Sequence, residues 1–476
     1  MTSGGSVVNG AGGNKYAALE GGVYISGGEG TVLNSGFVGS AKRQLFGDLY
    51  GENGVYHEAS VFLNAGGTVT NGSISDTTAH IQDGVRVSGG TGTVRNYGTI
   101  VSITQKAGTY YRSSHFVGYG VDLTGGGSLV NGSAKDSTAL IRGGTTGVAA
   151  AGGATTVTNF GTIVAEHNGV AVSFGSASDV LIEEASGVLT GRVIGGGGKL
   201  ALGAGAGAGT IGGIDGSITG FAAIVVNAGA DWRFVGPNTI VSGTSLSNRS
   251  TIIDDGTITN AGVVSLGALL QLSTNAELAN AEGGSVFLAG NVSVTTATGA
   301  TGTSFVNAGL LQKRNGPGTS IVSAPLANSG TVEVAKGTLD LAGVVTGGGA
   351  LNADAQTTLE FGAAVATGGM ASFAGANAVL RLDDAANFKA SIAGFAASET
   401  IDLRSIGFGA GTTIAYMGSA TAGTLTVTHG TESAQIALLG QFVAANFHAA
   451  SDGHGGTDIT FVAVPANAQP LLAASH

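Results

Sequence analysis

One motif returns at a nearly fixed spacing along the first 190 residues, and this repetition restricts the fold more than any other feature of the chain. The motif reads GGEGTVLNSGFV at 27–38, GGTGTVRNYGTI at 89–100 and GGATTVTNFGTI at 152–163. A second motif precedes each copy and reads GGSVVNGAGG at 4–13, GGTVTNGSIS at 66–75 and GGSLVNGSAK at 126–135. Self-similarity at a fixed period is the sequence signature of repeat folds.

The spacing of the motifs sets the size of the structural module. The two motifs of one repeat lie about 25 residues apart and the remainder divides into pieces of about 18, so the module has about 20 residues. A module this short cannot close a hydrophobic core alone and must stack on copies of itself. We therefore expect an all-β fold, a parallel β-solenoid. We expect a right-handed β-helix, because parallel β crossovers strongly prefer that hand.

Each motif contains one asparagine, and these residues are predicted to be structural corners. They are Asn9, Asn34, Asn71, Asn96, Asn131 and Asn159. Asparagine tolerates positive φ, and its amide can hydrogen-bond the equivalent residue one coil away. The Asn-Gly-Ser triplets at Asn71 and Asn131 also match a glycosylation sequon, but the repeat favours the structural interpretation.

The pattern along the chain predicts four segments. Residues 1–190 hold three repeats of about 62 residues. Residues 191–350 are expected to continue the solenoid in a looser form, since the asparagine motif returns at Asn260, Asn307 and Asn328. Residues 351–464 contain runs of strand length that alternate or are continuously apolar, which favours a compact β-rich C-terminal module with a possible role in secretion. Residues 465–476 form a tail of small residues.

Composition excludes several classes of protein. Glycine accounts for 87 of the 476 residues, but 43% of the chain is hydrophobic and only five prolines occur, which excludes disorder and a collagen-like rod. The net charge of −11, without a basic patch, argues against nucleic-acid partners. The absence of cysteine excludes disulfides, cysteine zinc sites and thiol nucleophiles. We expect no N-terminal signal peptide and no integral membrane segment, because no apolar run is long enough.

The repeated GG-x-G-T-V-x-N-x-G-T-I pattern over residues 1–350 resembles the passenger regions of bacterial β-strand-repeat adhesins and autotransporter-like surface proteins. The segment from LEFGAAV (359–365) to TDITF (457–461) resembles the C-terminal module of large secreted β-repeat proteins, often associated with type I secretion. The resemblance implies a secreted or cell-surface protein whose export signal, read by an export machinery, lies in the last part of the chain. The glycine-rich calcium-binding nonapeptide of some secreted repeat proteins is not repeated in this chain. Only the segment Asp452–Asp458 partly matches it, which argues against a calcium-binding β-roll.

Two insertions in the repeats, 41–58 and 105–119, gather tyrosines and charged residues and are the predicted ligand-binding loops. Tyrosines can stack on sugar rings, and charged groups can bond hydroxyls or uronate carboxylates. The candidate residues are Arg43, Asp48, Tyr50, Glu52, Tyr56, Tyr110, Tyr111, Arg112 and His115. The alternative interpretation is that both insertions are surface loops that cover one end of the solenoid.

The sequence favours an adhesin-like role in binding glycans or other cells over catalysis. Adjacent carboxylates such as Asp254 and Asp255 point to opposite faces of a strand and make no catalytic pair. The eight histidines lack metal-binding spacing. We therefore expect no enzyme activity, no cofactor and no metal. A polysaccharide lyase or hydrolase is the first alternative, and a self-assembling structural scaffold, suggested by open solenoid edges, is the second.

Overall fold

The computed structural model describes residues 1–39, 59–102 and 118–462 and confirms the predicted fold class, an all-β parallel β-solenoid with an antiparallel C-terminal part. The chain forms two compact units. Unit 1 comprises Met1–Arg233 and Gly243–Ser250, and unit 2 comprises Phe234–Ser242 and Thr251–His476. Helical structure in the described residues is limited to three short 3-10 turns, η1 (Ala11–Gly13), η2 (Ala385–Asn387) and η3 (Ala444–Asn446).

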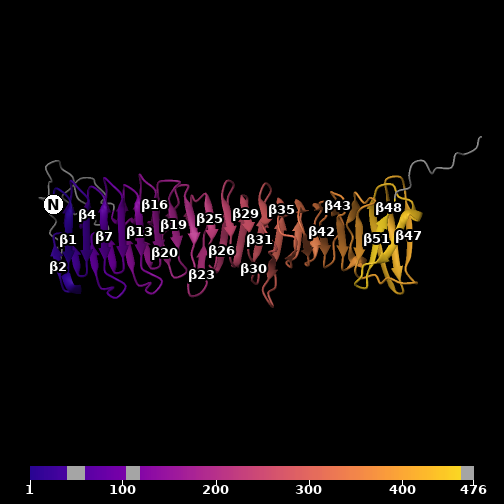
Figure 1. The fold of residues 1–476 in the computed structure, drawn as a ribbon, viewed down its shortest axis with the longest axis horizontal. Helices are drawn as coiled ribbons and strands as arrows, with labels where there is room; N and C mark the ends of the chain where they lie inside the picture. The colour runs from indigo at the N-terminus through magenta and orange to yellow at the C-terminus, as the bar shows by residue number, and fades with distance from the viewer. Residues whose placement is uncertain (40–58, 103–117, 463–476) are drawn as a thin grey trace, which may run out of the picture. The chain divides into compact units, whose positions relative to one another are not determined.

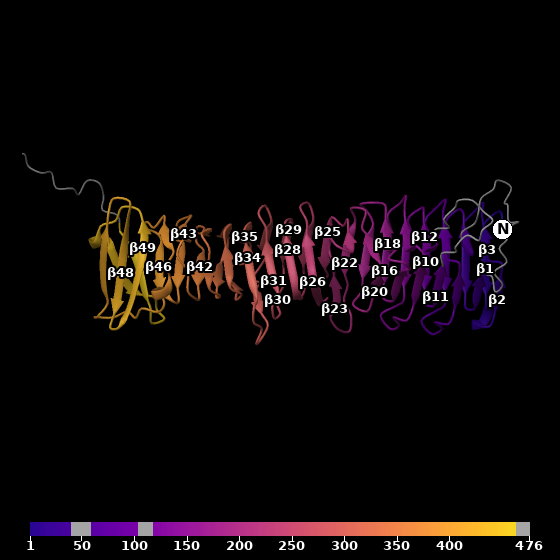
Figure 2. The same cartoon turned by 180° about the vertical axis from the view of Figure 1, so that it is seen from behind.

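Unit 1 is built from coils whose strands form three parallel faces (Figure 1 and Figure 2). Face A contains β1 (Gly5–Asn9), β4 (Gly30–Asn34), β7 (Gly67–Asn71), β10 (Gly92–Asn96), β13 (Gly127–Asn131), β16 (Thr155–Asn159), β19 (Val180–Glu183), β22 (Lys199–Leu202), β25 (Ala223–Val226) and β27 (Ser245–Asn248). Face B contains β2 (Ala18–Glu20), β5 (Phe37–Gly39), β8 (His80–Gln82), β11 (Thr99–Ser102), β14 (Leu140–Gly143), β17 (Thr162–Ala165) and β20 (Val188–Thr190). Face C contains β3 (Val23–Ile25), β6 (Val61–Leu63), β9 (Val85–Val87), β12 (Tyr119–Leu123), β15 (Thr146–Ala150), β18 (Val170–Phe174), β21 (Arg192–Ile194) and β24 (Ile218–Thr219). Unit 1 also contains β23 (Gly209–Gly212), and the strand β26 (Trp232–Ile240) begins in unit 1 and continues in unit 2.

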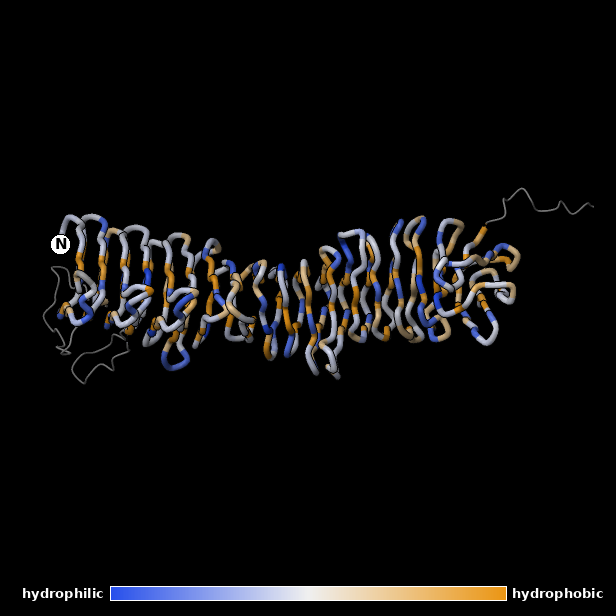
Figure 3. The backbone as a smooth tube through the Cα atoms, turned by 60° about the horizontal axis from the view of Figure 1, so that its bottom comes forward, coloured by the Kyte–Doolittle hydropathy of each residue, from blue (hydrophilic) through white to orange (hydrophobic). Residues whose placement is uncertain are grey.

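The repeat places the same motif position in the same column of every coil of face A. Val32, Val69 and Val94 are in register and fully buried, because alternate residues of each strand point into the coil. The alternation of apolar and polar residues along the strands is visible in Figure 3. A one-residue slip would expose this whole column, so the apolar pattern fixes the stacking register.

The turn after the face A strands differs from the expected geometry. None of the six motif asparagines has a positive φ. Each is the last residue of its strand, and the left-handed conformation falls on the following glycine at Gly10, Gly72 and Gly132, with φ of 83°, 76° and 79°. Glycine has no Cβ to strain this conformation, so the asparagine keeps extended backbone and its side chain points inward.

Unit 2 repeats the architecture with its own three faces. Face D contains β29 (Val263–Leu266), β32 (Ser285–Leu288), β35 (Leu310–Lys313), β38 (Thr331–Val334), β41 (Ala350–Ala353), β43 (Met370–Phe373) and β45 (Ser391–Ala393). Face E contains β30 (Leu270–Leu272), β33 (Val294–Thr296), β36 (Thr319–Val322), β39 (Thr338–Leu341), β42 (Thr358–Phe361), β44 (Val379–Leu382) and β46 (Thr400–Leu403). Face F contains β31 (Glu277–Asn280), β34 (Ser304–Asn307), β37 (Leu326–Asn328) and β40 (Val345–Thr346). The long strand β28 (Ile252–Asn260) pairs with both β30 and β31.

The C-terminal end of unit 2, here called the cap, is antiparallel. After β45, face D continues through β49 (Glu432–Leu439), β48 (Ala422–His429) and β47 (Thr413–Gly418). After β46, face E continues through β51 (Thr457–Phe461) and β50 (Phe447–Ser451). The two sheets meet through aromatic rings; the Tyr416 and Phe447 centroids are 5.4 Å apart, and those of Phe442 and Phe461 are 5.2 Å apart. The parallel coil pattern thus extends through residues 351–403, and the antiparallel pairs follow it.

Candidate functional site

The motif asparagines of unit 1 form a continuous ladder of side-chain amides inside the coils. Each Nδ2 donates to the Oδ1 of the next asparagine, from Asn9 to Asn159, at 2.8–2.9 Å. The six side chains belong to residues at most 5% exposed. The second donor position is also used, as in Asn96, whose Nδ2 donates to the Leu140 carbonyl at 3.1 Å. The side-chain amides hydrogen-bond the neighbouring coils and the backbone at the strand ends, which gives these asparagines a structural role.

The ladder of unit 1 ends on a buried carboxylate. Glu183 takes the asparagine position in β19, and Asn159 Nδ2 donates to its Oε1 and Oε2 at 3.0 and 3.1 Å. Burial raises the pKa of Glu183 well above its usual range, against the lowering effect of the Asn159 hydrogen bond. The ladder therefore ends on a group that holds a proton more readily than an exposed glutamate.

Unit 2 contains a second ladder, which includes an asparagine that the sequence motif missed. It runs through Asn260, Asn280, Asn307 and Asn328, with Nδ2 to Oδ1 distances of 2.7, 2.7 and 2.8 Å. Asn280 stands in ELANAEGG, where two residues, Ala281 and Glu282, separate the asparagine from the glycines. A search that allowed a longer gap between asparagine and glycine would have found it.

The outward side of face C carries a column of aromatic and charged residues. Tyr24, Phe62, Arg86 and Asp122 occupy equivalent positions in β3, β6, β9 and β12. The Tyr24 and Phe62 rings are 5.3 Å apart, and the Arg86 guanidinium carbon lies 5.7 Å from the centre of the Phe62 ring. Arg86 Nε is 3.4 Å from Asp122 Oδ2. Tyr24 is 42% exposed. We call this set the face C column.

The face C column lies beside the bases of both insertions. Residues 40–58 stand between β5 and β6, and residues 103–117 stand between β11 and β12, so both connect face B to face C. Phe62 is in the first strand after one insertion, and Asp122 is in the first strand after the other. The nine ligand-binding residues predicted from the sequence, from Arg43 to His115, lie outside the described residues and stay a prediction.

A sequence signal for the face C column was present but not used. The strands read VYISGG (23–28), VFLNAGG (61–67), VRVSGG (85–90) and VDLTGG (121–126). In the first three, two buried aliphatic residues flank one more exposed residue, and in the fourth the middle residue, Asp122, is 7% exposed. Aligning these segments would have placed the four outward side chains in one column before the structure was known.

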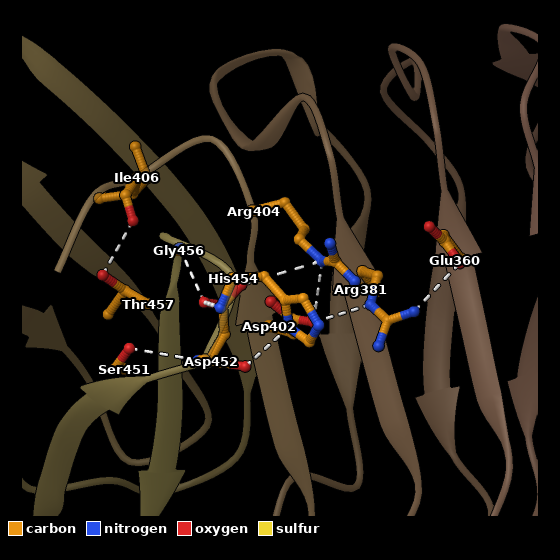
Figure 4. Close-up of polar contacts among 11 residues, drawn as sticks. Glu360, Arg381, Asp402, Arg404, Ile406, Ser451, Asp452, His454, Gly456 and Thr457 are labelled. Atoms are coloured by element: carbon orange, nitrogen blue, oxygen red, sulfur yellow. Dashed lines mark hydrogen bonds and ion pairs between the residues drawn. The ribbon is translucent and has the colours of Figure 1, made fainter.

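The outward side of face E carries a ladder of charged residues near the cap (Figure 4). Glu360, Arg381 and Asp402 are in register on β42, β44 and β46. Arg381 Nε donates to Asp402 Oδ2 at 2.7 Å, and its Nη1 donates to Glu360 Oε2 at 3.2 Å. Arg404 Nε lies 3.5 Å from Asp402 Oδ2 and 3.9 Å from Asp452 Oδ2. The ladder thus joins the last coil to the turn between β50 and β51.

The acidic residues around this ladder respond to burial and to one another. Burial, followed by the charges of Glu360 and Asp383, raises the pKa of Asp340 to about 6. Burial and the charges of Asp402 and Asp452 raise the pKa of Asp458. In both cases attraction to the arginines offsets only part of the combined effect of burial and of repulsion from neighbouring carboxylates.

The segment Asp452–Asp458, which partly matches the calcium-binding nonapeptide, forms a turn that is stabilised by its own side chain. Asp452 Oδ1 accepts hydrogen bonds from the backbone N–H groups of His454 and Gly456 at 2.7 and 2.8 Å (Figure 4). Across the described ranges no group of three or more histidine, aspartate or glutamate side chains is arranged to hold a metal ion. The ion pairs of Arg381 and Arg404 join the last coils of face E to the turn that contains Asp452, and we call this set of residues the face E clamp.

The clamp gives a direct prediction. Replacing Arg381 with methionine leaves Asp402, 5% exposed, and Glu360 without their shared cation. We expect the free energy of unfolding to fall by about 1–3 kcal/mol, and amide exchange to rise first in β50 and β51. Urea unfolding and hydrogen exchange measure these effects. The control is Lys336→Met, which removes an exposed cation of the same unit; equal losses in both variants would contradict the clamp.

No protein-family model matches the chain, and no curated protein matches it. No helix in the described part of the chain has the length and apolar character needed to cross a membrane. The class of this protein is therefore defined by its fold and its stacked amide ladders. It is a β-solenoid repeat protein.

Proposed function

We propose that this protein is an exported bacterial surface or matrix protein of the adhesin-like kind, which binds glycans through the face C column and the insertions at 41–58 and 105–119. The observation that supports this proposal most directly is the position of the column. Two aromatic rings, a guanidinium and a carboxylate stand in register on one face of unit 1, next to the bases of the insertions that carry the predicted tyrosines and charges.

The chemistry of the column suits a carbohydrate. Aromatic rings offer flat apolar surfaces against which the C–H faces of sugars pack. Arg86, whose side chain is 37% exposed, can donate hydrogen bonds to hydroxyl groups, and the buried Asp122 holds its guanidinium in place. A rigid scaffold that presents such groups next to variable loops is a common arrangement for binding sites. The carboxylate of Asp122 is paired with Arg86, which favours recognition over acid-base chemistry.

The proposal is tested by screening the full chain on a glycan array with Phe62→Ala as the face C variant. A second variant changes Tyr50, Tyr56, Tyr110 and Tyr111 to alanine. The matched control is Phe287→Ala, which removes another phenylalanine beneath an arginine, Arg314, 3.5 Å from the ring centre. We expect each site variant to weaken binding by about ten-fold or more, an effect of about 1.4 kcal/mol, and the control to leave it unchanged.

The same glycan-array experiment also distinguishes the adhesin-like role from an enzyme and from a purely structural protein. Release of reducing or unsaturated sugar ends by the wild-type protein would favour a polysaccharide-active enzyme and contradict the adhesin-like role. Wild-type binding that survives both site variants would place the ligand elsewhere on the molecule. If the wild-type protein binds no glycan, the proposal is wrong and a structural role for the solenoid becomes the better explanation.

A further inference from the structure

The cap ends in two strands that are paired on one side only within the described residues. β47 pairs with β48, and β50 pairs with β51. The two strands pack face to face, as the contact between Tyr416 and Phe447 shows. One end of unit 2 therefore presents two neighbouring strand edges whose outer N–H and C=O groups point away from the sheets.

These edges lack the devices that usually prevent edge pairing. Proteins protect open edges with charged residues, proline or bulges. β47 reads TIAYMG and β50 reads FHAAS, without lysine, arginine, acid or proline. No irregularity interrupts the register of β47 with β48 from Thr413 to Gly418. Met417 on β47 is 82% exposed. The edge of β47 is thus a regular, uncharged template for another strand.

We propose that two copies of this chain associate tail to tail, with β47 of one copy pairing antiparallel with β47 of the other. A row of backbone donors and acceptors is complementary to itself when turned by a two-fold axis normal to the sheet. Because the cap sheets face each other, the same axis brings β50 toward its counterpart and lets both sheets continue across the interface. The association is isologous, so it closes at two copies.

The pleat of the strand restricts the register of this pairing. Ile414 and Tyr416 point toward the inner side of the sheet, and Ala415 and Met417 point toward the outer side. A two-fold axis normal to the sheet keeps inner residues opposite inner residues and outer residues opposite outer residues. Ala415 therefore lies opposite its own copy or diagonal to it. A charge at this position meets the same charge in the second copy.

The test is sedimentation equilibrium and light scattering of the full chain over a range of concentrations. We expect a concentration-dependent dimer for the wild-type protein and a dimer about ten-fold weaker or more for Ala415→Lys, because like charges across paired strands repel. The matched control is Thr426→Lys, since Thr426 lies directly opposite Ala415 on β48, inside the sheet and away from the edge. It should dimerise as the wild type does.

Charge reversal keeps the test independent of folding defects. Ala415→Glu alone should dimerise as weakly as Ala415→Lys, whereas an equal mixture of Ala415→Lys and Ala415→Glu should recover a heterodimer. A wild-type protein that stays monomeric, a dimer that survives Ala415→Lys, or a mixture that fails to recover would each overturn the proposal. Growth beyond two copies would overturn it as well, since an isologous edge contact cannot propagate.

Discussion

Replacing Asn96 with alanine is expected to lower the free energy of unfolding by about 3–5 kcal/mol. Asn96 lies in the middle of the amide ladder and is fully buried. Its loss removes the donor to Asn131 Oδ1, the acceptor for Asn71 Nδ2 and the donor to the Leu140 carbonyl. Each buried polar group left without a partner costs about 1–3 kcal/mol. Urea unfolding followed by far-UV circular dichroism measures the change.

Two controls make this prediction specific to the ladder. Arg95→Ala changes the exposed neighbour on the same strand and should alter stability by less than about 0.5 kcal/mol. Asn9→Ala removes the first member of the ladder. Asn9 donates to Asn34 Oδ1, but among the described residues it accepts no hydrogen bond from another asparagine of the ladder, so its loss should cost less than Asn96→Ala. Equal effects at Asn9, Arg95 and Asn96 would show that the ladder does not stabilise the coils.

The ladder also explains why the fold was predictable from the sequence. Stacked coils place equivalent residues in one column. If that column requires one residue type, the same residue recurs once per coil along the sequence and can be recognised as a motif. The asparagine column of face A was found in this way, and it led to the parallel β-solenoid. The backbone reason given for it was incomplete, because the positive φ belongs to the glycines that follow, such as Gly10 and Gly72.

Features formed between dissimilar residues were not predictable in the same way. The face C column contains a tyrosine, a phenylalanine, an arginine and an aspartate, so no residue type repeats even though the position does. The face E ladder joins Arg381 to acids on neighbouring strands, and Arg404 to Asp452 from a distant turn. Such contacts depend on the three-dimensional register and on the return of the chain in the cap. Sequence periodicity can place the face C residues in one column, but it does not encode the contacts of the face E ladder.

Asp254 is the clearest case of a buried charge that the sequence did not reveal. It was read as half of an adjacent acidic pair, but its side chain points into the coil from β28 and is fully buried. Its Oδ1 accepts the Gly256 N–H at 3.1 Å, and its Oδ2 has no hydrogen-bond partner. Burial, with a smaller contribution from the charge of Asp255, raises the pKa of Asp254 to about 7. Below about pH 7 the folded protein therefore favours the protonated form of Asp254.

The sign of the resulting pH dependence follows from proton linkage. The pKa of Asp254 is higher in the folded state than its ordinary value of 3.8, so between these values the folded state binds more protons than the unfolded state. Stability is then greatest below about pH 4, falls as the pH rises toward 7, and changes little from this group above that. Each pH unit in the window is worth about 1.4 kcal/mol.

We therefore expect the wild-type protein to lose about 2–3 kcal/mol of stability between pH 5 and pH 8 through Asp254. Asp254→Asn keeps an Oδ1 acceptor for Gly256 and removes the charge, so it should unfold at higher urea than the wild type at pH 8 and show a flatter pH profile. The control is Glu282→Gln, which neutralises an exposed acid in the same unit and should leave the profile unchanged. If Asp254→Asn keeps the full wild-type slope, the buried carboxylate is not its source, and the acids around Arg381, with Asp340 at a pKa of about 6, become the cause.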